Sequence, residues 1–522
     1  NPDKETVLTP WRVVNMHLSD CIGGWCFFNE RFDGPCERMV ENINGKLFDF
    51  LPTNEPRRID QGTVTADVFH SESRILEINS KTGLYPLYVA YSLFRERLKD
   101  YCKEQLIDID TVSVTEEQVV WDDILQDNIF VICNTPMAAR ITERTLRGFR
   151  KVERMNIKET NLIERALDDR EQLISDIQRA GFWKRTTKKD MIKFNAVVGN
   201  PPYQIMDGGA GVSAKPVYNT FVKLAKDISP NVISMIMPAK WYTDGKGLEA
   251  FRSEMLKDKR IFKLVDFTDS RECFENVDIA GGICYFLWNK DYNGQCKFVS
   301  KHQGQTKAFD RNLSESDNFI RHIEAISIIE KVKAISKYGF YNDKVSTRKP
   351  FGLNTNDSPL DSGDITLVYN GGKGYYKSSL ITKGNDIIPK WKVIISRLTA
   401  EHAGQADKEG RKRVLSSLNH LRPNEICTET YLVVDSMDTE EEMNFLTSYL
   451  KTRFVRFLIA QLASTQQMTK EKFAFVPIQD FTSSSDIDWT QPVADIDQQL
   501  YKKYGLTQEE TTFIERMIKP ME

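Results

Sequence analysis

The residues of this chain that are best suited to chemistry lie in one run, Asn200-Pro201-Pro202-Tyr203. Two consecutive prolines hold the backbone extended and supply no N–H donors, so the Asn200 side-chain oxygen and the Pro201 carbonyl remain as acceptors beside an aromatic ring. Two acceptors suit a planar amine such as the N6 amine of adenine, because they can bind both N–H groups and free the nitrogen lone pair for attack. Catalysis would then rest on positioning and electrostatics, with Tyr203 stacked on a base that has left its duplex.

The elements that must position this run alternate between strands and helices over the first 300 residues. Short apolar runs predict strands, and segments with helical apolar spacing predict helices between them. This order favours an α/β fold with a doubly wound, mostly parallel sheet. The predicted strands are 74–78, 128–133, 194–199, 232–237, 261–267 and 282–288, and the predicted helices are 84–97, 137–146, 216–227 and 247–256.

Several polar residues follow predicted strands at one edge of this sheet. Glu77 closes strand 74–78 and Gly83 ends the turn after it, whereas Cys133-Asn134 closes strand 128–133 and Asn200 follows strand 194–199. In doubly wound sheets, ligands bind outside the carboxyl ends of the strands. We therefore expect these residues to share one crevice.

The composition favours a cytosolic enzyme with two or three domains. The chain has 522 residues, of which 40% are hydrophobic, and no apolar run approaches the length of a membrane span. The nine cysteines are scattered and odd in number, which favours free thiols in a reducing compartment. The spacing of His17, Cys21, Cys26 and Cys36 matches no common zinc pattern, so we expect no metal site. Because the first residue is Asn, we expect the chain to be part of a longer polypeptide.

The order of motifs resembles that of the gamma class of adenine-N6 DNA methyltransferases associated with restriction–modification. Thr9-Pro10 begins a segment similar to the motif that covers the methionine end of S-adenosylmethionine, and residues 75–83 stand where the cofactor-binding first motif is expected. Asn200 to Tyr203 match the catalytic tetrapeptide. Residues 273–286 resemble the later motif whose phenylalanine, here Phe274, packs against the flipped base. The resemblance covers roughly residues 9 to 290.

The resemblance implies a class I S-adenosylmethionine-dependent methyltransferase with a Rossmann-like doubly wound sheet. Two positions depart from the family pattern. Lys81 stands at the first glycine of the first motif, and Cys133-Asn134 takes the place of the acidic residue that binds the ribose hydroxyls. We expect these departures to weaken cofactor binding or to shift it to other contacts. The cofactor-binding residues that the resemblance implies are Thr9, Pro10, Glu77, Asn79, Gly83 and Asn134.

The composition changes after Lys301, so we expect the methyltransferase domain to cover residues 1–300. A polar loop and a helix at 318–336 predict a helical linker over 301–344. Residues 345–484, with strands expected at 365–369, 392–396, 430–434 and 473–477 and a long helix at 439–462, resemble an α+β target-recognition domain. Residues 485–522 predict a closing helical segment. Basic clusters at 184–189, 348–349 and 411–413 favour DNA binding, and we expect contacts from Arg348, Lys349 and Arg397.

We expect the chain to methylate the N6 amine of adenine in a specific sequence of double-stranded DNA, as the modification module of a restriction–modification system. The sequence shows no paired-carboxylate nuclease core and no phosphate-loop helicase motif, so a nuclease or helicase would lie elsewhere in the polypeptide or in a partner. Two alternatives stay open. One is a catalytically silent methyltransferase fold that serves as a DNA-binding specificity module, and the other is a methyltransferase that acts on RNA or on a protein amide.

Overall fold

The structure of this protein is a computed structural model. It describes residues 8–36, 38–39, 52–53, 56–183, 191–205, 215–243, 247–275, 277, 279, 281–302, 304–315, 318–398, 407, 410–463 and 467–521. The chain divides into two compact units. The first comprises residues 1–239 and 245–317, and the second comprises residues 240–244 and 318–522.

The first unit is built on one large sheet. Its strands are β5 (Ile75–Ile78), β6 (Ile129–Cys133), β7 (Asn156–Glu159), β8 (Ala196–Gly199), β11 (Val232–Pro238), β12 (Ile261–Phe267), β13 (Ile283–Asn289), β14 (Cys296–His302) and β15 (Gln305–Arg311). In the described part of the chain these nine strands are ordered β15-β14-β12-β13-β11-β8-β5-β6-β7. β7, β6, β5, β8 and β11 are parallel neighbours, whereas β13 runs antiparallel between β11 and β12, and β15 runs antiparallel to β14.

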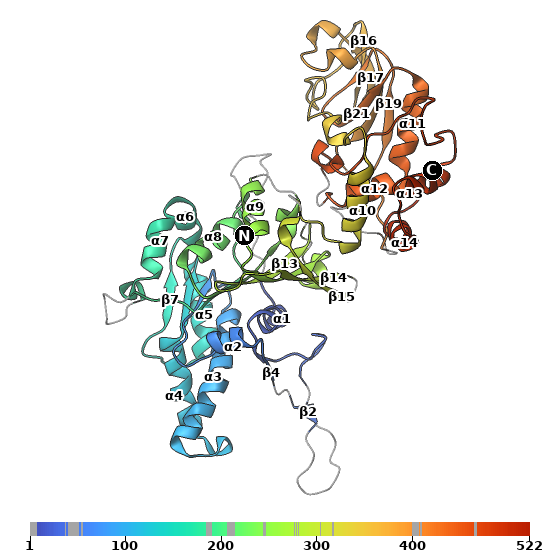
Figure 1. The fold of residues 1–522 in the computed structure, drawn as a ribbon. Coiled ribbons are helices and arrows are strands. Elements are labelled where there is room, and N and C mark those ends of the chain that lie inside the picture. Colours follow the sequence, from blue (N-terminus) through green and yellow to red (C-terminus); the bar gives the residue numbers. More distant parts are fainter. Residues whose placement is uncertain are drawn as a thin grey trace. The chain divides into compact units, whose positions relative to one another are not determined.

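Helices cover both faces of this sheet (Figure 1). The longer helices of the unit are α1 (Trp11–Cys21), α3 (Leu84–Gln105), α4 (Val114–Asp127), α5 (Pro136–Arg147), α6 (Leu162–Asp168), α7 (Arg170–Ile177), α8 (Tyr218–Ile228) and α9 (Glu249–Lys257), and a short helix, α2, spans Thr63–Val68. On one face Ile75, Val131 and Val198 pack into the core that α1, α3 and α4 cover. On the other face the ring of Phe130 contacts the rings of Trp183 and Phe194. The predicted α/β fold with a doubly wound sheet is confirmed (Figure 1).

The sequence located the six strands and four helices predicted in the first 300 residues. It missed the strands β14 and β15 and the helices α1, α4, α6 and α7. Residues 305–311, expected in a polar loop, form β15 and pair with β14. Most side chains of β15 are exposed, because an edge strand needs no apolar pattern to hold its backbone in a sheet. β7 was missed for the same reason, since only Asn156 of its four residues is buried.

The second unit consists of two small sheets and five α-helices among its described residues, with short 3-10 helices between them. One sheet has the order β17 (Gly372–Tyr376), β16 (Ile365–Tyr369) and β20 (Glu425–Cys427), and the other has the order β19 (Leu418–Leu421), β18 (Trp391–Ser396) and β21 (Tyr431–Met437). Residues of β16, β18, β20 and β21 share one apolar cluster. The opposite side of β18 and β21 packs against the helices α10 (Ile323–Ile335), α11 (Glu440–Lys451), α12 (Arg453–Ala460), α13 (Val493–Lys503) and α14 (Gln508–Met517).

Two predictions for the second unit were wrong in detail. The long helix expected at 439–462 is two helices, because Thr452 adopts an extended backbone and its side chain caps α12 by accepting from Val455 N. The strand expected at 473–477 is absent from the described structure, where residues 470–473 form a 3-10 helix and Pro477 makes an isolated bridge with Phe340. The strands expected at 365–369, 392–396 and 430–434 are β16, β18 and β21.

Candidate active site at the switch point of the sheet

The candidate site lies where the order of the sheet changes direction. The chain leaves β5 through α3 toward β6 on one side, and it leaves β8 through α8 toward β11 on the other. β5 and β8 are parallel neighbours, and the carboxyl ends of such strands are where a doubly wound sheet binds its ligand. A hydrogen bond from Asn79 Nδ2 to the Asn200 carbonyl oxygen, 3.3 Å long, joins the two loops. The structure therefore brings the turn after β5 and the run Asn200 to Tyr203 together, as the sequence predicted.

Asn200 is buried and held from three directions. Its side-chain Nδ2 donates to the Thr9 hydroxyl at 2.9 Å, and its backbone is tied to Asn79. Gly199 before it has φ +148°, and a Cβ atom at that position would lie 3.0 Å from the Ile78 carbonyl oxygen. The other end of the Asn200 amide, Oδ1, is buried without a hydrogen-bond partner among the described residues. An acceptor left open in this way is the group that a substrate amine needs.

Glu77 is a buried acid on β5, and Lys81 is a basic residue in the turn after that strand. Burial raises the pKa of Glu77 to about 8, against the opposing effects of the Ser80 hydroxyl and of Lys81. Burial also lowers the pKa of Lys81 to about 8, although the Glu77 carboxyl raises it. Glu77 Oε2 has no hydrogen-bond partner in the described part of the chain. The turn thus offers a carboxyl oxygen to a polar ligand, even with a lysine at the position of the first glycine.

Gly83 and Asn134 have structural contacts of their own. A Cβ on Gly83, which has φ +77°, would lie 3.0 Å from Thr142 Cα in α5, so close packing of the turn against α5 requires a glycine there. Asn134 Oδ1 accepts from Ile163 N at 3.2 Å and so supports the start of α6. A carbonyl oxygen has a second lone pair, so a contact with a ligand hydroxyl stays possible for Asn134.

The two aromatic residues differ in their exposure. Tyr203 is partly buried and packs against the core, and burial raises the pKa of its hydroxyl well above the usual range. The side chain of Phe274 is 2% exposed. Its ring must be uncovered before it can stack on a base, so its predicted role requires a local rearrangement.

The N-terminal segment reaches two parts of the site. Pro10 is the N-cap residue of α1, and Thr9 before it contacts Asn200. Arg12 donates to the Cys273 carbonyl oxygen at 3.1 Å and so anchors the loop that carries Phe274. Arg12 was not predicted as a site residue, although it lies only two positions after Pro10.

The side chains predicted to contact DNA already form hydrogen bonds within the second unit. Arg348 forms two hydrogen bonds with the Glu429 carboxylate, at 2.6 and 3.2 Å, and the Arg397 guanidinium donates to the Glu429 carbonyl oxygen at 3.3 Å. Lys349 donates to Asn354 Oδ1 at 2.5 Å. Each would have to exchange or share these partners to bind DNA. The basic cluster at 184–189 lies outside the described residues.

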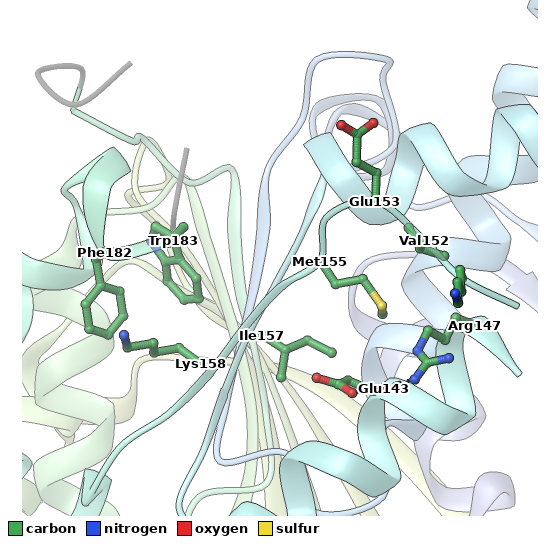
Figure 2. Close-up of a pocket in the computed structure, with 10 residues that line it drawn as sticks. Glu143, Arg147, Val152, Glu153, Met155, Ile157, Lys158, Phe182 and Trp183 are labelled. Atoms are coloured by element: carbon green, nitrogen blue, oxygen red, sulfur yellow. Dashed lines mark ion pairs between the residues drawn. The ribbon is translucent and has the colours of Figure 1, made fainter. Parts of the chain in front are cut away.

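A cavity of about 670 Å³ lies beside β7 and α5. Figure 2 shows Phe182, Trp183 and Lys158 on one side of this cavity and Glu143 and Arg147 on the other. None of the site residues predicted from the sequence lines it. Among the residues that the structure describes, no cluster of three or more His, Cys, Asp or Glu side chains could hold a metal ion. The described helices are also too short or too polar to cross a membrane.

Comparisons with known proteins identify the central segment. Residues 127–274 match the family model described as Eco57I restriction-modification methylase. An uncharacterized adenine-specific methylase of Mycoplasma pneumoniae is 34% identical over 137 residues, which cover 26% of this chain and 32% of that protein. The match thus spans about a third of the length of that relative. The matched family segment contains Asn200 and Phe274, and it confirms the predicted resemblance to restriction–modification adenine methyltransferases there.

Solved structures of restriction–modification enzymes also align with the chain. The Type IIL restriction-modification enzyme MmeI in complex with DNA aligns at 10% identity over 85% of this chain and 72% of that chain, with a TM-score of 0.46. A nuclease-deletion mutant of the Type ISP restriction-modification enzyme LlaGI, in complex with a DNA substrate mimic, aligns at 11% identity over 90% of this chain and 46% of that chain, with a TM-score of 0.44.

Proposed function

We propose that this chain, whose residues 127–274 match the Eco57I restriction-modification methylases, transfers a methyl group from S-adenosylmethionine to the N6 amine of adenine in a specific DNA sequence. One observation carries the proposal. The Asn200 Oδ1 atom, in an Asn-Pro-Pro-Tyr sequence at the switch point of the sheet, is buried and without a partner among the described residues. An adenine amine that donates to this oxygen would satisfy it.

The residues at the switch point fit the proposed cofactor. Glu77 presents a buried carboxyl oxygen without a partner in the described structure, and Asn79 and Asn134 lie at the ends of the neighbouring strands. These residues, with Pro10 and Gly83, would hold S-adenosylmethionine, which supplies an electrophilic methyl group when bound. The resemblance also implies Thr9, but its hydroxyl bonds Asn200 instead. The contacts already made by Gly83 and Asn134 leave the cofactor roles of these two residues to be tested.

In the proposed reaction the protein positions and polarises the amine. Asn200 Oδ1 and the Pro201 carbonyl accept the two N–H groups, which directs the nitrogen lone pair toward the methyl carbon. The N–C bond forms as the C–S bond breaks, and the resulting ammonium then loses its proton to solvent. Tyr203 would hold the base by stacking, and Phe274 would do so once its ring is uncovered.

The proposed setting is double-stranded DNA in the cytoplasm, with the second unit choosing the sequence. All cysteines in the described structure are free and buried, which agrees with a reducing compartment. A nuclease or helicase would belong to another part of the polypeptide or to a partner. The second candidate function, a catalytically silent DNA-binding module, is favoured by Lys81 at the first-glycine position and by the engaged oxygen of Asn134.

Transfer of tritium from labelled S-adenosylmethionine to duplex DNA, RNA and protein tests these functions. We expect label on one adenine of a specific duplex sequence, and a rate about 100- to 1,000-fold lower for Asn200→Ala with DNA binding retained. Asn195→Ala is the control, because Asn195 lies beside the same strand and bonds Arg74 N rather than the site. Label on RNA or protein alone would show that the substrate is not DNA. DNA binding without any methyl transfer would support the catalytically silent module.

A further inference from the structure

Thr9 has a different contact from the one that the resemblance implies. It lies just before α1, its side chain is buried, and its hydroxyl oxygen is 2.9 Å from Asn200 Nδ2. The segment is fixed in place nearby, because Val13 N and Val14 N donate to the Pro10 carbonyl oxygen and Arg12 bonds the loop at Cys273. The first turn of α1, which packs on the sheet, therefore holds Thr9 next to the side-chain amide of Asn200.

The two ends of the Asn200 amide are used unequally. Nδ2 donates to Thr9, whereas Oδ1 is buried with no partner among the described residues. We propose that Thr9 is a positioning residue for methyl transfer, whose hydroxyl accepts from Nδ2 and thereby keeps Oδ1 available to the target amine. The inference rests on the proposed function and assigns Thr9 a role toward the acceptor base rather than toward the cofactor.

The orientation of the Asn200 amide depends on where its own N–H groups find acceptors. An adenine amine offers two donors, so the Asn200 amide must present its oxygen and turn its own N–H groups inward. A hydroxyl can accept there, but an apolar side chain cannot, and a buried donor without a partner is costly. Without the Thr9 hydroxyl, Nδ2 loses the acceptor that it bonds at 2.9 Å, or the amide turns over and its N–H groups face those of the adenine amine. Both outcomes reduce the stabilisation of the transition state and so lower the rate. Neither changes the contacts to the cofactor.

The test compares Thr9→Val with Thr9→Ser in the full chain. Valine keeps the shape and removes the hydroxyl, whereas serine keeps the hydroxyl. We expect Thr9→Val to lower kcat about ten- to a hundred-fold at saturating cofactor, and Thr9→Ser to restore most of it. The Kd for S-adenosylmethionine, measured by calorimetry, should stay within about twofold of the parent for both variants. Thr65→Val is the matched control, since Thr65 is also buried and donates to the Ile22 carbonyl oxygen away from the site.

A raised Kd with an unchanged kcat in Thr9→Val would overturn the inference and make Thr9 a cofactor contact. An equal loss of kcat in Thr65→Val would reduce the effect to general destabilisation and also overturn it. A second readout does not depend on turnover. The side-chain amide protons of Asn200, assigned by their loss in Asn200→Ala, should exchange slowly with solvent in the parent and in Thr9→Ser and faster in Thr9→Val.

The two readouts separate this inference from the proposed function. If the parent transfers no methyl group to DNA, the proposed function fails, and the exchange measurement still decides whether Thr9 holds the amide. If the parent is active and Thr9→Val exchanges and turns over like the parent, the inference fails alone.

Discussion

At the scale of single residues, the site depends on which side-chain groups remain accessible to a ligand after the protein has folded. Tyr203 and Phe274 illustrate this, because one is partly buried against the core and the other is almost fully covered. A ring stacked on a flipped base contributes roughly 1–3 kcal/mol. Phe274 must therefore be uncovered before it can stack, whereas Tyr203 is already partly exposed.

We predict that Tyr203→Ala lowers methyl transfer and raises the fluorescence of 2-aminopurine at the target position, because quenching by the ring is lost. Phe274→Ala should do the same and should also lower the free energy of unfolding by about 3–5 kcal/mol, since a buried ring is removed. Steady-state fluorescence and denaturant titration measure the two effects. Unchanged fluorescence and rate in either variant would show that its ring does not contact the base.

Glu77 gives a prediction about pH. Burial raises its pKa to about 8 from the ordinary value of 4.5, so the folded state holds this proton more tightly than the unfolded chain does. The resulting stabilisation is complete below about pH 4.5 and is lost as the pH rises to about 8. Glu77→Gln should therefore flatten the decline in the free energy of unfolding over this window. The pKa of Lys81 is lowered to about 8, so its own contribution changes above this window.

Urea titrations at several pH values measure that slope. Glu104→Gln, which changes an exposed carboxyl on α3, should keep the slope of the parent. A slope in Glu77→Gln equal to that of the parent would mean that the carboxyl at Glu77 is ionised in the folded protein at neutral pH.

At the scale of elements, the site is the product of two strand ends that lie close together. β5 and β8 pair in parallel, and the chain turns at Gly199 with φ +148° under the Ile78 carbonyl. Only a residue without a Cβ fits both that angle and that distance. The position of Asn200 is thus set by the backbone before it.

We predict that Gly199→Ala lowers the free energy of unfolding by about 1–3 kcal/mol, because alanine is strained at this backbone angle and crowds Ile78. The shift in Asn200 should also reduce methyl transfer more than the change in stability explains. Turnover of the folded fraction, combined with thermal unfolding, separates the two effects. Gly181→Ala, where a Cβ meets no atom within 4 Å, is the control, and equal behaviour of the two variants would contradict the argument.

At the scale of the whole molecule, each compact unit has its own apolar core. We predict that a fragment ending at residue 317 binds S-adenosylmethionine but loses its preference for one DNA sequence. A fragment ending at residue 300 should be less stable, because it cuts β14 and removes β15. Calorimetry and methylation of mixed duplexes measure these properties. A 1–317 fragment that still methylates one sequence would move sequence choice into the first unit.

The sequence by itself determined the alternating strands and helices, the Asn200 tetrapeptide and its place at a strand end, because local apolar patterns and consecutive prolines act over a few residues. It could not find β7 or β15, whose backbones pair at sheet edges while most of their side chains meet solvent. Tertiary structure alone decided that Thr9 bonds Asn200 across 191 positions of sequence and that Phe274 is covered. It also decided that Arg348 pairs with Glu429. Such contacts depend on how distant segments pack, which no short pattern encodes.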